Sequence, residues 1–138
     1  MLKRLHRHAR PDVLFVEPSG LVTTGELRAV ASMALRDISY ETGPFVTLID
    51  GPSFEFTWSE RRNLIIAQVT GADLVAVSRA DLLDAQLLET AKDCLLPYTS
   101  HPIRISAKES RGIETLVSVI QAAERRVEHG FLKREEKK

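Results

Sequence analysis

Short apolar runs alternate with segments of helical periodicity along this chain, and the alternation constrains its fold more than any other feature. Each run is bounded by turn residues and is rich in β-branched or aromatic side chains, as buried strands are. The predicted strands cover residues 13–16, 45–49, 74–77 and 103–105. Because parallel strands are joined by crossover helices, this order predicts an α/β fold with a mainly parallel sheet and flanking helices.

The connecting segments carry helix signals of their own. Thr23 and Glu26 form a capping box, and apolar residues repeat at helical spacing from there to Ile38. Ser59 is the predicted N-cap of a second helix, after an irregular aromatic stretch. Two further helices are expected at about 83–96, stopped by Pro97, and at about 112–129, followed by Gly130.

Length and composition limit the classes of protein that the chain can form. Its 138 residues suffice for one α/β domain, predicted over residues 1–130, with a charged and frayed tail at 131–138. Nineteen basic residues balance nineteen acidic ones, so charge gives no reason to expect binding to nucleic acid or to a membrane. No apolar run approaches the roughly 20 residues of a membrane span and no apolar signal segment follows Met1, so a cytoplasmic protein is expected. A single cysteine, Cys94, excludes a disulfide within the chain and a Cys-rich metal cluster.

Polar residues follow the predicted strands at corresponding places. Glu17, Asp50, Ser78 and Ser106 each lie at or just past the end of a predicted strand. In open parallel sheets, ligands bind beyond the carboxyl ends of the strands. We therefore expect these four residues to share one site. The alternative is that the strands of a parallel sheet simply end in polar residues, and the spacing alone does not decide between the two.

The most specific motif in the chain is the segment that contains Glu17. Residues 11–21 read Pro-Asp-Val-Leu-Phe-Val-Glu-Pro-Ser-Gly-Leu. Together with residues 47–50, Gln68, 72–74, 78–82 and 106–108, this segment resembles the CobW-like branch of the P-loop GTPases, relatives of HypB, UreG and MeaB. The resemblance covers roughly residues 11–125 and implies a partial P-loop GTPase fold with three Rossmann-like layers.

The resemblance implies catalytic roles for the Glu-x-x-Gly motif that distinguishes the family. Glu17 would hold Mg²⁺, directly or through water, because this ion prefers hard oxygen ligands and keeps several waters. Gly20 would bring its backbone N–H close to the γ-phosphate, which a residue without a Cβ permits. If the family resemblance is set aside, Glu17 can be interpreted as a carboxylate at a strand end that caps the next helix. That interpretation stays open.

The resemblance also implies a site that reads guanine. Asp81 would accept two parallel hydrogen bonds from the N1–H and the exocyclic amine of the base, a pair that adenine does not offer. The usual family motif is Asn-Lys-x-Asp, whereas this chain has Ser78-Arg79-Ala80-Asp81. Ser78 lacks the amide of Asn, while Arg79 can still lie as a planar cation over a purine. Asp81 is equally a preferred N-cap for a helix that begins near Leu82, and the two roles can coexist.

A third motif would complete that site. Ser106, Ala107 and Lys108 match the family loop that places a backbone N–H behind the guanine O6. The match lies after a predicted strand and before Gly112, as the family pattern requires. An ordinary loop with a solvated lysine is the alternative interpretation.

Two family motifs do not occur in the sequence. It contains no Gly-x-x-x-x-Gly-Lys-Ser/Thr, the loop that wraps the phosphates and supplies a lysine and a Mg²⁺ ligand. It also contains no Cys-x-Cys-Cys, the metal-binding motif of the family's metallochaperones. The chain therefore resembles the back half of a GTPase domain. GTP or GDP with Mg²⁺ are its expected ligands, bound weakly, and hydrolysis by the chain alone should be negligible.

The missing phosphate loop has a structural consequence. In the parent fold the strand that carries the loop lies inside the sheet, so its absence leaves inner strand edges unpaired, and such edges invite pairing with another chain. We expect self-association, or a partner segment that supplies the strand and loop. A metalloprotein client follows from the role of the family in metal-cofactor assembly.

Two functional interpretations remain. In the first, the chain is a guanine-nucleotide-binding half-domain, and the carboxylates of Glu17 and Asp81 flank one crevice along the rim of a parallel sheet. In the second, it is a non-catalytic interaction module on a degenerate GTPase scaffold that no longer binds nucleotide.

Overall fold

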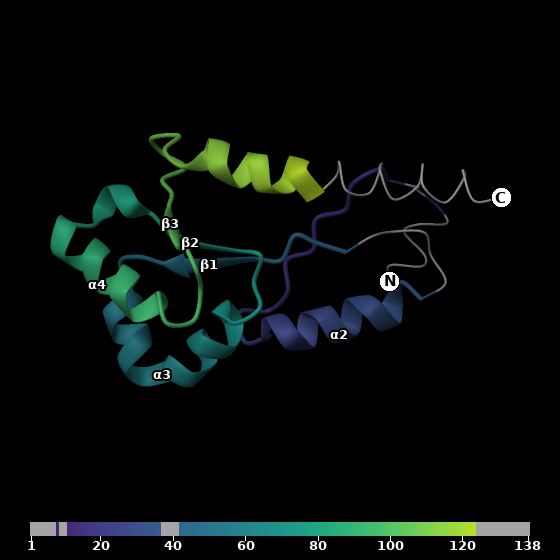
Figure 1. Ribbon diagram of the computed structural model, residues 1–138, viewed down its shortest axis with the longest axis horizontal. Coiled ribbons are helices and arrows are strands. Elements are labelled where there is room, and N and C mark those ends of the chain that lie inside the picture. Colours follow the sequence, from purple (N-terminus) through teal and green to yellow (C-terminus); the bar gives the residue numbers. More distant parts are fainter. Residues whose placement is uncertain (1–7, 9–10, 37–41, 124–138) are drawn as a thin grey trace.

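A computed structural model describes residues 8, 11–36 and 42–123. Its helices and strands follow one another in the alternating order that the sequence predicts (Figure 1). They are α2 (Thr24–Ala34), β1 (Val46–Asp50), α3 (Phe54–Val69), β2 (Leu74–Ser78), the 3₁₀ turn η1 (Ala80–Leu82), α4 (Ala85–Leu95) and β3 (Ile103–Arg104). Residues 113–123 form a further helix that follows β3. No helix among these residues is long and apolar enough to cross a membrane.

The three described strands form one parallel sheet in the order β1-β2-β3. Val46 lies opposite Leu74 in the first pair, and Ala76 lies opposite Ile103 in the second. The predicted parallel α/β fold is therefore confirmed. Parallel pairing requires each connection to cross back over the sheet, and α3 and α4 make these crossings.

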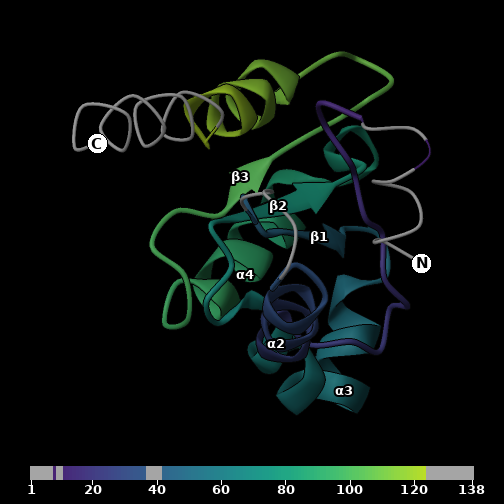
Figure 2. The ribbon, with the colours of Figure 1, turned by 90° about the vertical axis from the view of Figure 1, so that its right-hand side faces the viewer.

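Helices cover both faces of the sheet and give three layers. Figure 2 shows α2, α3 and α4 below the sheet and the helix of residues 113–123 above it. The main core lies between the sheet and the lower helices, where Val69, Val75 and Leu95 are fully or almost fully buried. Trp58 and Tyr98 pack against this core from its border.

Hydrogen bonds to the end of α3 hold α2 in place. The capping box of Thr23 and Glu26 is present, as the sequence predicts. The hydroxyl of Thr24 donates to the carbonyl oxygen of Gln68, which also accepts a 2.8 Å bond from the Thr47 hydroxyl of β1. Arg28 donates to the carbonyl oxygen of Gly71 at 2.7 Å and so reaches the loop before β2.

The predicted strand at residues 13–16 is wrong. These residues form no strand, their side chains are 38–75% exposed, and among the described residues they make no backbone hydrogen bonds. A strand is stable only where a neighbouring strand takes up its backbone N–H and C=O groups. Strand propensity predicted the type of element, but no described neighbour pairs with it.

The second helix also begins earlier than predicted. Its N-cap is Ser53, and the aromatic stretch before Ser59 lies inside α3. Phe54 and Trp58 are one turn apart on this helix, and their rings stack at 5.6 Å between centroids. A kink at Arg61 divides the helix into two pieces, which explains why one helical period does not describe it. The predicted C-terminal end of the last helix, Gly130 and the charged tail lie outside the described residues.

Candidate functional site

Backbone hydrogen bonds join the loops at the carboxyl ends of the strands. The N–H of Gly51 donates to the carbonyl oxygen of Ser78 at 3.1 Å, and the N–H of Ala80 donates to Ile105 at 3.0 Å. The hydroxyl of Ser78 turns back and donates to the carbonyl oxygen of Ile49 at 3.0 Å. The loops that follow β1, β2 and β3 therefore form one rigid edge. Ser78 is occupied in bracing this edge, as a short side chain without an amide can do.

Two glycines allow these loops to approach one another. A Cβ at Gly51 would come within 2.6 Å of the Ser78 carbonyl oxygen and of a Leu83 methyl carbon. Gly112 has φ of +73°, and a Cβ there would collide with the carbonyl oxygen of Arg104. Only glycine fits at these two positions without a shift of the backbone.

Arg79 forms an ion pair with Asp50 across the first two strands. Its Nε donates to Asp50 Oδ1 at 2.6 Å, and the hydroxyl of Ser53 donates to the other carboxylate oxygen at 2.5 Å. The Arg79 guanidinium, followed by the Ser53 hydroxyl, lowers the pKa of Asp50. Arg79 has left-handed backbone angles, with φ of 53°, and its side chain remains about half exposed.

Asp81 lies next to the loop that follows β3. A hydrogen bond from the Ser106 side chain, together with the charges of Lys108 and Arg111, lowers the pKa of the Asp81 carboxyl. Its carboxylate is consequently ionised at neutral pH. The structure therefore joins two motifs that are about 25 residues apart in the sequence, as the shared edge of a parallel sheet predicts.

The loop of Ser106 is a closed turn. The N–H of Ser106 donates to Arg111 at 2.9 Å, and the N–H of Arg111 donates back at 3.0 Å. The buried Ser106 hydroxyl also accepts the N–H of Glu109 at 3.1 Å. Ala107 and Lys108 occupy the exposed tip of this loop. Ser106 thus fixes the loop and contacts Asp81, whereas the tip stays open to a ligand.

Gly20 does not lie at this edge, and among the described residues no contact joins Glu17 to the other strand ends. α3 starts after the carboxyl end of β1 and finishes before the amino end of β2, so Gln68 lies at the amino ends of the strands. Its side-chain amide donates to the carbonyl oxygens of Gly20 at 2.8 Å and Val22 at 3.2 Å. Figure 1 shows this segment, drawn in purple, beside α2 and away from the carboxyl ends.

The physical reason is the missing strand at residues 13–16. A paired strand would carry Glu17 to the carboxyl edge, but the unpaired segment is held only downstream, at Gly20 and Val22. No contact in the described part of the chain joins Glu17 and Asp81 across the crevice that they are expected to flank. Glu17 is therefore not assigned as a ligand of a magnesium ion near Asp81. Among the described residues, no group of three or more His, Cys, Asp or Glu side chains could hold a metal.

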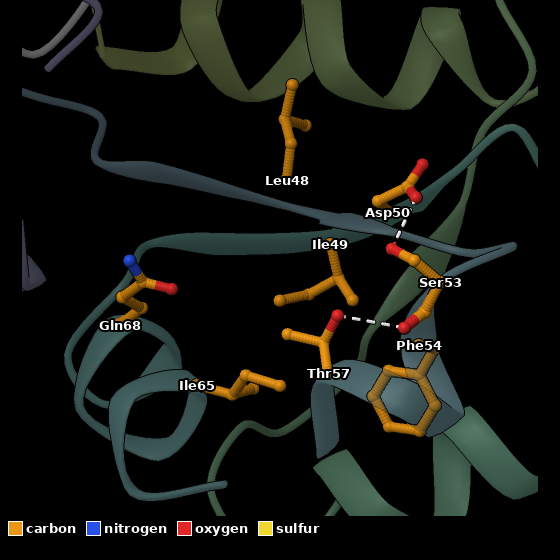
Figure 3. A pocket seen from close by; sticks show the side chains of 8 residues that line it. All are labelled: Leu48, Ile49, Asp50, Ser53, Phe54, Thr57, Ile65 and Gln68. Carbon is orange, nitrogen blue, oxygen red and sulfur yellow. Dashed lines mark hydrogen bonds between the residues drawn. The ribbon is translucent and has the colours of Figure 1, made fainter. Parts of the chain in front are cut away.

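A pocket of about 100 Å³ lies between β1 and α3. Asp50 and Ser53 line its carboxyl end and Gln68 lines the other (Figure 3). Ile49, Thr57 and Ile65 point toward one another across its floor, whereas Leu48 points away from α3.

Sequence reasoning missed two residues of the carboxyl edge, Ser53 and Arg111. Ser53 follows Asp50 by three residues in a turn, a spacing at which side chains can bond one another. Arg111 carries no comparable signal, because its place depends on the closed turn that starts at Ser106.

In chemical terms, the carboxyl edge offers a fixed anionic acceptor, Asp81, beside two cations and an exposed guanidinium, Arg79. Such an edge can accept paired N–H donors from a planar ring and place a planar cation next to it. The Ser53 hydroxyl donates to the Asp50 carboxylate, but the lowered pKa of that carboxyl makes it a weak base for activating a nucleophile.

Comparison with known proteins gave one match. The model of the family described as CobW/HypB/UreG, nucleotide-binding domain, matches residues 1–101. No curated protein and no solved structure matches the chain.

Proposed function

Because the chain belongs to the CobW/HypB/UreG nucleotide-binding domain family, we propose that it binds a guanine nucleotide at the carboxyl edge of its sheet. The base would lie against Asp81 and the loop of residues 106–108. The observation that carries the proposal is the placement of Asp81 next to the loop of Ser106. The N–H of Ala80 donates to Ile105 at 3.0 Å, and Ser106, Lys108 and Arg111 lower the pKa of the Asp81 carboxyl. This carboxylate can accept the N1–H and the exocyclic amine of guanine together, and one such bidentate contact is worth about 1–3 kcal/mol of discrimination.

Arg79 and the tip of the 106–108 loop would contribute in different ways. The guanidinium of Arg79 is about half exposed although it is paired with Asp50, so one face remains available to a purine ring. The backbone N–H groups of the exposed tip, at Ala107 and Lys108, would face the guanine O6. Ser78 has no part in base recognition in this proposal, because its hydroxyl is bonded to Ile49.

We assign the chain to nucleotide-dependent assembly of metal cofactors, with a metalloprotein as client, on the ground of family alone. The 138 residues contain no phosphate-binding loop, so they should hydrolyse GTP negligibly by themselves. Phosphate-binding groups would then come from a partner segment or from a second copy. We derive no magnesium step, because Gly20 is bonded to Gln68 at the amino ends of the strands and no described contact brings Glu17 to Asp81.

The test is a titration of the purified chain with fluorescent GDP and GTP, and with the adenine analogues as competitors. Asp81→Ala should weaken guanine-nucleotide binding about 5- to 100-fold, the loss expected from one bidentate contact. The matched control is Asp93→Ala, which removes an exposed carboxylate of the neighbouring helix α4. Equal affinity for guanine and adenine nucleotides, or an Asp81→Ala variant that binds like the control, would refute the proposal.

A second variant tests the geometry of recognition. Asp81→Asn replaces one acceptor oxygen by an N–H₂ donor, which suits the 2-carbonyl of xanthine instead of the 2-amine of guanine. The variant should therefore prefer XDP over GDP. Such a change of preference from GDP to XDP cannot arise from a general loss of stability.

The alternative function is a non-catalytic interaction module that has lost nucleotide binding. The position of Gly20 at the amino ends favours it, because the backbone N–H of Gly20 then does not reach the phosphates of a nucleotide bound at Asp81. A folded chain that binds no guanine nucleotide in the titration would support this alternative.

A further inference from the structure

The outer edge of β1 is unpaired among the described residues. The N–H of Leu74 donates to Phe45 and the N–H of Gly51 donates to Ser78, so residues of odd number in this stretch direct their backbone groups toward β2. Backbone groups of successive residues point to opposite sides of a strand. The N–H and C=O groups of Val46, Leu48 and Asp50 therefore point away from the sheet. Such an edge is a template for a further strand.

The pocket between β1 and α3 opens beside this edge. It measures about 100 Å³ and is lined by Ile49, Ile65 and Phe54, with Gln68 at one end (Figure 3). A strand added along β1 would point every second side chain toward α3. Half of the lining residues are polar, and Ile49, Phe54 and Ile65 supply the apolar contacts for one side chain of such a strand.

A segment suited to this edge belongs to the same chain. Residues 13–16 are Val, Leu, Phe and Val, a sequence with strong strand propensity. They are exposed, with Phe15 at 75%, and among the described residues they form no hydrogen bonds. Four consecutive exposed apolar residues are unfavourable in water unless they are covered part of the time.

The segment is tethered within reach of the edge. Gln68, which lines the pocket, also holds the carbonyl oxygens of Gly20 and Val22. Val16 lies four positions before Gly20, a stretch that spans up to about 14 Å when extended. The edge from Val46 to Asp50 is about 13 Å long at the usual strand rise. Gln68 also accepts the hydroxyl of Thr47 through its backbone carbonyl oxygen, so Gly20 is held near the amino half of this edge, and Val16 can reach that half while Gly20 stays in place.

We propose that residues 13–16 form a strap that closes onto the free edge of β1 as a fourth strand. One of its apolar side chains enters the pocket between β1 and α3, and the backbone groups of Leu48 are satisfied. The structure represents the open state. In the closed state, the strap blocks the edge at which another chain would add a strand.

Hydrogen exchange of the full chain tests the strap without any nucleotide, so it is independent of the proposed guanine site. The amide of Leu48 should exchange about tenfold or more slowly than in a variant whose strap cannot dock. That variant is Leu14→Asp/Phe15→Asp. Successive side chains of a strand face opposite sides, so one of the two charges faces the pocket in either register.

The matched control is Val30→Asp/Met33→Asp, which adds two charges at exposed apolar positions on α2. The Leu48 amide should stay protected in this control, and Trp58 emission should show that all three proteins are folded. An unprotected Leu48 amide in the native chain, or protection that survives Leu14→Asp/Phe15→Asp, would overturn the proposal. Protection that grows with protein concentration would also overturn it, because a second copy would then be the occupant.

Discussion

At the scale of single residues, contacts at the carboxyl edge depend on side chains that are small or absent. Gly51 lets the loop after β1 lie against Ser78 and Leu83, and the Asp50–Arg79 ion pair spans the same two loops. These contacts keep the ends of β1 and β2 in one arrangement. The orientation of the proposed guanine site therefore depends on them.

We expect Gly51→Ala to destabilise the fold by about 1–3 kcal/mol, because its Cβ would overlap backbone and side-chain atoms. The free energy of unfolding from urea titration measures the effect. Gly25→Ala, on α2, is the control, because nothing lies within 4 Å of a Cβ at Gly25. The same loss in both variants would contradict the packing argument.

The Asp50 carboxyl should make stability depend on pH. Its pKa is lowered in the folded state, so its contribution is present above the unfolded value, about 3.9, and is lost as the pH falls through the lowered folded pKa. Because the pair is partly exposed, we expect Asp50→Asn to reduce the free energy of unfolding by only about 0.5–1 kcal/mol at pH 7.

Urea titrations at several pH values measure this dependence. The difference between the native chain and Asp50→Asn should shrink toward zero as the pH falls below 4. Asp93→Asn, at an exposed position on α4, controls for the change in net charge. A difference that persists at low pH would show that the lost contact is not ionic.

At the scale of elements, each helix is tied to the sheet by a small number of identifiable contacts. α2 depends on its capping box and on the bond from Thr24 to Gln68 at the end of α3. It also depends on Arg28, whose guanidinium bonds Gly71 and lies 4.0 Å from the centroid of the Phe45 ring. α2 therefore contributes to holding Gln68, the residue that positions Gly20.

The capping box gives a prediction for α2. Thr23→Ala removes the hydroxyl that accepts the N–H of Glu26, which should cost about 1 kcal/mol of stability. Glu26→Gln keeps an acceptor for the N–H of Thr23 and should cost clearly less. Thermal unfolding followed by circular dichroism compares the two. Equal midpoints for both variants would mean that the cap does not limit the stability of the fold.

Elements whose determinants are local in the sequence were predicted well. The three paired strands and the capping box follow from apolar runs and from residues a few positions apart. The meeting of the loops after β1, β2 and β3 also followed, because parallel strands bring their carboxyl ends to one edge.

Elements whose determinants lie far apart in the sequence were not predicted. Residues 13–16 have strand propensity, but whether they pair depends on a neighbour that propensity does not describe. The Asp50–Arg79 pair depends on the left-handed backbone of Arg79 and on one rotamer, neither of which the sequence signals. The position of Gly20 follows from the amide of Gln68, about 50 residues away in the sequence.

At the scale of the whole molecule, stability rests on a small core between the sheet and α3 and α4. The side chains of Val75 and Leu95 are completely buried there, and Phe54 and Trp58 close its border. Native domains are stable by only about 5–15 kcal/mol, so one cavity in such a core removes a large part of the total.

Leu95→Ala should therefore destabilise the protein by about 2–5 kcal/mol. Leu96→Ala, at the next position, removes the same atoms from a side chain that is 41% exposed and should cost much less. Urea unfolding monitored by Trp58 emission measures both, since Trp58 packs against this core. Equal losses would show that Leu95 is not a core residue in solution.

The parallel register also has a consequence during synthesis. Each strand pairs with one that lies roughly 30 positions further along the chain, as Val46 does with Leu74. At about 5–20 residues per second, a ribosome needs roughly 1–6 s to deliver β2 after β1. Over that interval β1 emerges from the exit tunnel with the backbone N–H and C=O groups of both of its edges unpaired. A chaperone or a neighbouring nascent chain can then compete for it before its own partner exists.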